Sequence, residues 1–103
     1  MKKILTTVLL LVGLFSFSQN GSFEERMEYG DNQIDSKNYK EAITVFEKLL
    51  TEQPKNVRAL NNAGRAYFNS KNFEKAKEKF RLAALYASPH DKEDLALYYS
   101  NLS

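Results

Sequence analysis

From residue 23 onward, the apolar residues of the chain recur at spacings of three and four, the period of an amphipathic α-helix. This pattern predicts an all-α fold whose helices lie at about 23–36, 39–52, 57–70, 73–87 and 89–102. The predicted connections are short, so we expect successive helices to pack antiparallel.

Polar residues that can cap a helix stand at the start of each predicted element. The expected N-caps are Ser22, Asn38, Asn56, Asn72 and Ser88. Glutamate follows Ser22 and Asn38 by three residues, as in a capping box. Ser88 is followed by Pro89, which suits the first turn of a helix. These signals support the helix starts independently of the periodicity.

The chain also repeats itself at a fixed interval. Residues 36–39, Ser-Lys-Asn-Tyr, return as Ser-Lys-Asn-Phe at 70–73, which is 34 residues later. Further equivalent pairs at the same interval are Gly30 with Gly64, Ala42 with Ala76, and Phe46 with Phe80. Each period contains two predicted helices, so the repeating unit is a helical hairpin.

These residues resemble the tetratricopeptide repeat, a 34-residue helical hairpin. The second unit carries the motif at Leu60, Ala63, Gly64, Tyr67, Ala76, Phe80 and Pro89, and the first at Tyr29, Gly30, Ala42, Phe46 and Pro54. The resemblance implies a right-handed α-solenoid of antiparallel helix pairs. Its expected parts are a first unit at 23–56, a second at 57–88, and a half-repeat or capping helix at 89–103.

Two positions of the first unit depart from the repeat motif. Arg26 stands where a bulky apolar residue is usual, and Gln33 replaces a tyrosine. Because the first helix of a solenoid has no preceding repeat, we expect both side chains to face water. The aromatic residues at equivalent places are expected in the core, namely Tyr39, Phe46, Phe73 and Phe80.

The N-terminus has the pattern of a secretory signal peptide. Two lysines precede the apolar run Ile4–Phe17, and small residues at 16 and 18 favour cleavage after Ser18. The sequence thus predicts a signal peptide at 1–18, a short linker at 19–22, and a small exported bacterial protein that is periplasmic or secreted. An uncleaved inner-membrane anchor is the alternative, although the run is short for a membrane span.

Composition narrows the possible partners and chemistry. Cleavage would remove two lysines and no acidic residue, leaving 13 basic and 13 acidic residues, so nucleic acid is not an expected partner. Membrane contact is expected only through an uncleaved signal sequence. The chain has no cysteine, which excludes disulfides and thiolate metal sites.

No pattern of catalytic residues stands out in the sequence. His90 is the single histidine and has no second imidazole or thiolate to share a metal. The chain has neither a glycine-flanked serine elbow nor a glycine-rich phosphate loop. We therefore expect no catalytic residues, no metal and no cofactor, and no enzymatic activity.

The resemblance implies a binding groove lined by the first helix of each unit. Candidate peptide-binding residues are Asp31 and Asp35 in the first unit, and Arg58, Asn61, Asn62, Arg65 and Asn69 in the second. The polar residues at 61, 65 and 69 are spaced by four, so they form one row along a helix. The alternative is an ordinary solvated face with ion pairs between the two helices. A clamp for a peptide's terminal carboxylate is only partly matched.

The sequence favours a non-catalytic scaffold that binds another protein or peptide through this groove. Two alternatives remain open. One is a structural subunit that self-assembles into a homo-oligomer or docks through its terminal helix. The other is a glycan-binding accessory module that uses aromatic residues such as Phe68 and Tyr86.

Overall fold

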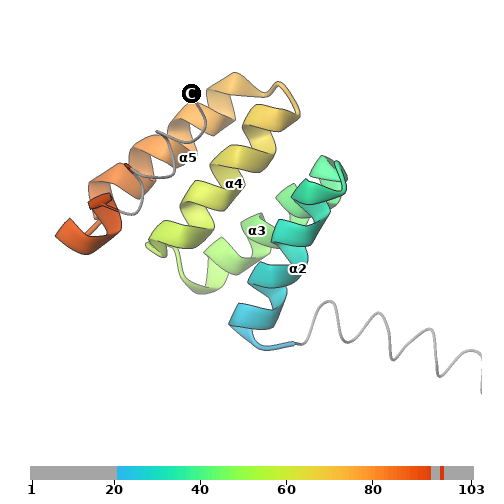
Figure 1. Cartoon of the computed structure of the whole chain (residues 1–103), viewed down its shortest axis with the longest axis horizontal. Coiled ribbons are helices and arrows are strands. Elements are labelled where there is room, and N and C mark those ends of the chain that lie inside the picture. Colours follow the sequence, from blue (N-terminus) through green and yellow to red (C-terminus); the bar gives the residue numbers. More distant parts are fainter. Residues whose placement is uncertain (1–20, 94–95, 97–103) are drawn as a thin grey trace, which may run out of the picture.

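The computed structural model describes residues 21–93 and residue 96, and these residues form a helical array (Figure 1). The helices are α2 at Phe23–Asp35, α3 at Tyr39–Glu52, α4 at Val57–Asn69 and α5 at Phe73–Tyr86. Each matches a predicted helix to within one residue at either end. The predicted signal peptide, and most of the predicted fifth helix, lie outside the described residues.

Four of the five predicted N-caps make the expected hydrogen bond. The side-chain oxygens of Ser22, Asn56 and Asn72 each accept from a backbone N–H three residues later, at 3.1, 2.9 and 3.4 Å. Ser88 forms a reciprocal capping box, since its Oγ accepts from Asp91 N at 3.2 Å while its own N–H donates to Asp91 Oδ2 at 3.0 Å. Residues 89–93 are accordingly helical.

Asn38 is the N-cap residue of α3 as predicted, but the side-chain capping bond expected there is not formed. Its side chain makes no capping hydrogen bond to α3, and its amide instead donates to Gln33 Oε1 at 3.0 Å. The reason is the tight turn before it, which brings the Asn38 side chain back to the end of α2.

That turn is built identically in both units. Lys37 and Lys71 adopt positive φ angles of 66° and 69°. Lys37 N donates to Ile34 O at 2.9 Å, and the next residue's N–H donates to Gln33 O at 2.8 Å; the second turn repeats both bonds. This is the Schellman motif that ends a helix. It places a lysine in the left-handed backbone conformation, which glycine adopts with the least strain.

The core lies between α2, α3 and α4. Its largest fully buried side chains are Phe46, Met27, Leu49 and Leu60. Phe46 packs against Gly30 with the tip of its ring, and an added Cβ would stand 2.7 Å from Phe46 Cζ. Phe80 packs similarly on Gly64, where an added Cβ would stand 2.5 Å from the ring. The two glycines therefore let each hairpin close tightly.

Not every predicted core aromatic is buried. Phe46 is fully buried, and Tyr39 and Phe80 are partly buried, but Phe73 is 57% exposed, so its assignment to the core is wrong. Its counterpart Tyr39 has the full-length α4 as the next helix along the array, whereas only the helical turn at 89–93 follows α5 within residues 21–93. Phe73 contacts Phe68 edge-to-face, with ring centroids 5.3 Å apart.

The expectation that Arg26 and Gln33 face water is also wrong. The Arg26 side chain is only 13% exposed, and its guanidinium donates to both carboxylate oxygens of Glu52 at 2.5 and 2.8 Å. Its Nε donates to Gly21 O at 2.9 Å. Gln33 is half-buried and accepts from Asn38. Arg26 and Gln33 are thus paired with polar groups of the first unit.

A polar network links three helices near the core. Lys79 of α5 lies 2.6 Å from Glu47 Oε1 of α3, and its side chain is 12% exposed. Burial, together with the Glu47 carboxylate, raises the pKa of Tyr67 on α4. The hydroxyl of Tyr67 and the Lys79 ammonium therefore share one carboxylate, which helps hold α3, α4 and α5 in register.

Candidate protein-binding face

The predicted site residues lie on two helices that contact each other across the units, α2 and α4. We call their polar surface the α2/α4 face, and it comprises Glu24, Asp31, Asp35, Arg58, Asn61, Asn62, Arg65 and Asn69. The helical period creates it, because Leu60, Ala63 and Tyr67 turn into the core and leave the polar positions of α4 on another side.

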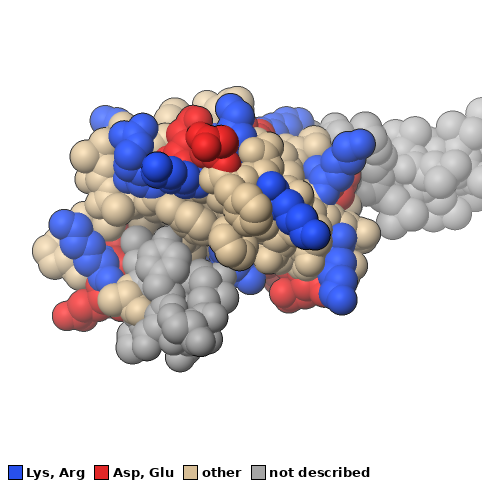
Figure 2. All heavy atoms as spheres, turned by 90° about the horizontal axis from the view of Figure 1, so that it is seen from above, with Lys and Arg blue, Asp and Glu red and all other residues tan. Residues whose placement is uncertain are grey.

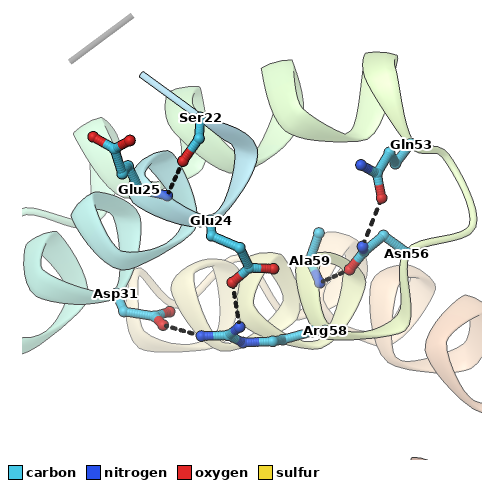
Figure 3. Close-up of polar contacts among 8 residues, drawn as sticks. All are labelled: Ser22, Glu24, Glu25, Asp31, Gln53, Asn56, Arg58 and Ala59. Carbon is cyan, nitrogen blue, oxygen red and sulfur yellow. Dashed lines mark hydrogen bonds and ion pairs between the residues drawn. The ribbon is translucent and has the colours of Figure 1, made fainter. Parts of the chain in front are cut away.

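Arg58 lies in the first turn of α4 and links the two helices of this face through ion pairs (Figure 3). Its guanidinium donates to Glu24 Oε2 at 2.8 Å, and its other terminal nitrogen lies 3.8 Å from Asp31 Oδ2. The side chains of Arg58 and Glu24 are 58% and 73% exposed. An ion pair as exposed as this contributes at most about 1 kcal/mol to stability. Arg58 can therefore readily leave Glu24 for another acceptor.

Asp31 is more enclosed than its neighbours. Its side chain is 28% exposed, and its Oδ1 is buried with no hydrogen-bond donor among the described residues. Burial raises the pKa of Asp31, while the positive charges of Arg58 and Arg65 oppose that rise. Asp31 therefore acts chiefly between the helices, as the acidic partner of the two arginines.

The amide residues of the face differ in accessibility. Asn61 and Asn62 are 7% and 6% exposed, and Asn62 Oδ1 accepts from Arg65 Nη1 at 3.5 Å. Arg65 is half-buried, whereas Asn69 and Asp35 are exposed. Along the row, exposure therefore increases from buried Asn61 through half-buried Arg65 to exposed Asn69.

Ion pairing across the face can be predicted from the sequence when equivalent positions of the two units are compared. The spacing of residues within one helix does not predict it. Glu24 and Arg58 are exactly one repeat apart, and so are Asp31 and Arg65. Equivalent positions of adjacent units are neighbours in a solenoid, so opposite charges there predict pairing.

The charges around the molecule are mixed in sign. Figure 2 shows lysine and arginine side chains spread over the surface it presents, with acidic groups between them. No group of three or more His, Cys, Asp or Glu residues that could hold a metal occurs within the described part of the chain. In that same part, no helix combines the length and apolar character needed to cross a membrane.

The aromatic residues considered for glycan stacking are already engaged. Tyr86 is 38% exposed, and Lys55 Nζ stands 5.5 Å from the centre of its ring, occupying one face. Phe68 is 55% exposed and contacts Phe73.

The fold, two equivalent helical hairpins stacked in sequence, places the chain among the helical-repeat proteins. Comparison with protein-family profiles matches residues 33–93 to the tetratricopeptide repeat. No curated protein matches the chain. Because the match covers more than half of the sequence, the chain belongs to the tetratricopeptide repeat family. Domains of this family generally bind other proteins and are typically non-catalytic scaffolds.

Proposed function

We propose that this protein is a non-catalytic scaffold that binds another protein or a peptide through the α2/α4 face. The observation that carries the proposal is Arg58, an exposed arginine in the first turn of α4 whose ion pairs with Glu24 and Asp31 are weak enough to exchange. Asp35 and Asn69, which are exposed at the C-terminal ends of α2 and α4, supply further hydrogen-bonding groups on the same face.

We also propose that residues 1–18 direct export, so that the mature protein works in the periplasm or outside the cell. The support is the basic start, the apolar run and the small residues before Gln19. N-terminal sequencing of the protein recovered from the cell envelope fraction should begin at Gln19. Recovery of the intact N-terminus with membranes would instead support the anchored alternative.

The binding proposal is tested by crosslinking in intact cells. A photo-crosslinking amino acid at Asn69 should yield discrete adducts with another protein, because this position is exposed on the α2/α4 face. The matched control carries the same group at Lys48, which is exposed on α3. Adducts of equal yield and identity from both positions would contradict binding through this face.

The role of the charged residues is tested in the same assay. Replacing Arg58 and Arg65 together by glutamine should reduce the Asn69 adducts several-fold while circular dichroism still reports a folded helical protein. Replacing Lys40 and Lys48 by glutamine removes the same charge from α3 and should leave the adducts unchanged. Unaltered adducts from the folded arginine variant would show that binding does not use these side chains.

A further inference from the structure

The two helices of the α2/α4 face carry opposite charges. Helix α4 contains Arg58 and Arg65 and no aspartate or glutamate, whereas α2 contains five acidic residues and one arginine. Arg58 is paired with carboxylates that come from α2. The structure thus shows which chemical group this arginine binds, namely a carboxylate, the group that a guanidinium fits best.

The two carboxylates that contact Arg58 differ in how firmly they are held. Asp31 is enclosed between the helices, with its side chain 28% exposed, and its Oδ2 lies 3.8 Å from one terminal nitrogen of the guanidinium. Glu24 accepts from the other terminal nitrogen at 2.8 Å, yet its side chain is 73% exposed (Figure 3). A side chain as hydrated as Glu24 leaves its partner at little cost, because water replaces the lost contact. Glu24 can therefore leave Arg58 while Asp31 stays beside it.

One side of α4 presents Arg58, Arg65 and Asn69, whose spacings of seven and four residues keep them in line along the helix. At 1.5 Å per residue, the two arginines are about 10 Å apart along the helix axis. An extended peptide covers about the same distance in three residues. Two carboxylates three positions apart in such a peptide therefore match the spacing of the arginines.

We propose that the segment bound at the α2/α4 face is acidic and that Glu24 competes with it for Arg58. One carboxylate of the segment takes the place of Glu24 on the guanidinium, and a second, three positions along, reaches Arg65. Glu24 is then an internal competitor that occupies Arg58 until the partner binds. This competition presupposes the binding proposed for the α2/α4 face, to which it adds the chemistry of the partner and a residue that limits its affinity.

The acidic character of the partner is tested by NMR titration of the isotope-labelled protein, purified from cells that express the full chain. The probe is a short serine and glycine peptide with two glutamates three positions apart, and its blocked ends carry no charge. This peptide should shift the backbone amide signals of α4. The same peptide with glutamine or lysine in place of both glutamates should not.

The competition is tested by removing Glu24. Glu24→Gln should tighten binding of the glutamate peptide by about two- to fivefold, the range that an ion pair of this exposure supplies. The matched control is Glu28→Gln, which removes the same charge from an exposed position of α2 outside the face and should leave the affinity nearly unchanged. In a protein that carries Arg58→Gln, Glu24→Gln should give no gain, because the competition acts through Arg58. Thermal melts verify that each variant is folded.

The possible failures are distinct. Equal affinities of the folded Glu24→Gln and Glu28→Gln variants for the glutamate peptide would overturn the competition. Preference for the lysine peptide, or no shift of the α4 signals with any peptide, would overturn the acidic class of partner. The crosslinking test at Asn69 does not depend on these peptides, so binding through the α2/α4 face stands or falls on a separate result.

Discussion

The two helical hairpins have nearly the same local structure but differ in burial. Phe46 of the first is fully buried, while its counterpart Phe80 is only partly buried. Tyr39 is partly buried, while its counterpart Phe73 is 57% exposed. The difference follows from position, since α4 packs against the first hairpin, whereas only the helical turn at 89–93 follows the second within residues 21–93.

The comparison teaches that a repeat motif specifies a hairpin but not its environment. The same phenylalanine on the same glycine is a core residue in one unit and a partly exposed residue in the next. Stability should therefore be distributed unequally, with more of it held by side chains at the junction of α3 and α4. Matched substitutions in the two units test this directly.

The largest expected difference is between Phe46→Ala and Phe80→Ala. Truncating fully buried Phe46 should lower the free energy of unfolding by about 3–5 kcal/mol, because it loses apolar burial and leaves a cavity. Phe80→Ala should cost roughly half as much. Urea denaturation of both variants measures the difference. Equal losses would contradict the unequal burial of the two units.

The glycines beneath these rings give a second matched pair. A methyl group at Gly30 would stand 2.7 Å from Phe46, and one at Gly64 would stand 2.5 Å from Phe80. We expect Gly30→Ala to destabilise by about 2 kcal/mol and Gly64→Ala by about 1 kcal/mol, because enclosed Phe46 has less room to shift. Thermal melts of the two variants provide the comparison. The reverse order would mean that the shorter distance, rather than the enclosure, decides the cost.

The lysines at positive φ should respond alike in the two units, since their turns have the same geometry. Lys37→Gly and Lys71→Gly should each stabilise the protein by about 1 kcal/mol by relieving the left-handed conformation. Chemical denaturation of both variants measures whether the free energy of unfolding rises and whether it rises by the same amount. A loss of stability in either variant would show that the lysine side chain itself contributes to the turn.

The smallest effect concerns Glu52, whose bond from Arg26 exists only in the first unit. That bond lowers the pKa of Glu52 from its ordinary value of 4.5, so the pair stabilises the folded protein above that value. This contribution is lost as the pH falls through the lowered pKa. Glu52→Gln should therefore flatten the fall in stability between about pH 5 and pH 3. The free energy of unfolding of both proteins is measured by denaturation at several pH values. The same pH dependence in Glu52→Gln and the unchanged protein would contradict a contribution of the Glu52 carboxylate.

The exposure of the predicted site residues could be inferred from the sequence only in part. Spacing placed Arg58 and Asn69 correctly on an exposed surface of α4, because helical period depends only on the local sequence. It did not anticipate that Asn61 and Asn62 would be almost fully buried. Their burial depends on the helices that pack around α4, which the sequence of one helix alone does not reveal.

The sequence by itself determined the helices, most of their caps, the 34-residue repeat and hence the family. These features arise from interactions between residues three or four apart, or from comparison of one unit with the next. Only the tertiary structure decided which copy of each repeated residue is covered, how Arg26 is paired, and which polar side chains of the α2/α4 face remain exposed. Burial and long-range pairing depend on which helix packs against a residue. The residues around that position in the sequence do not specify this helix.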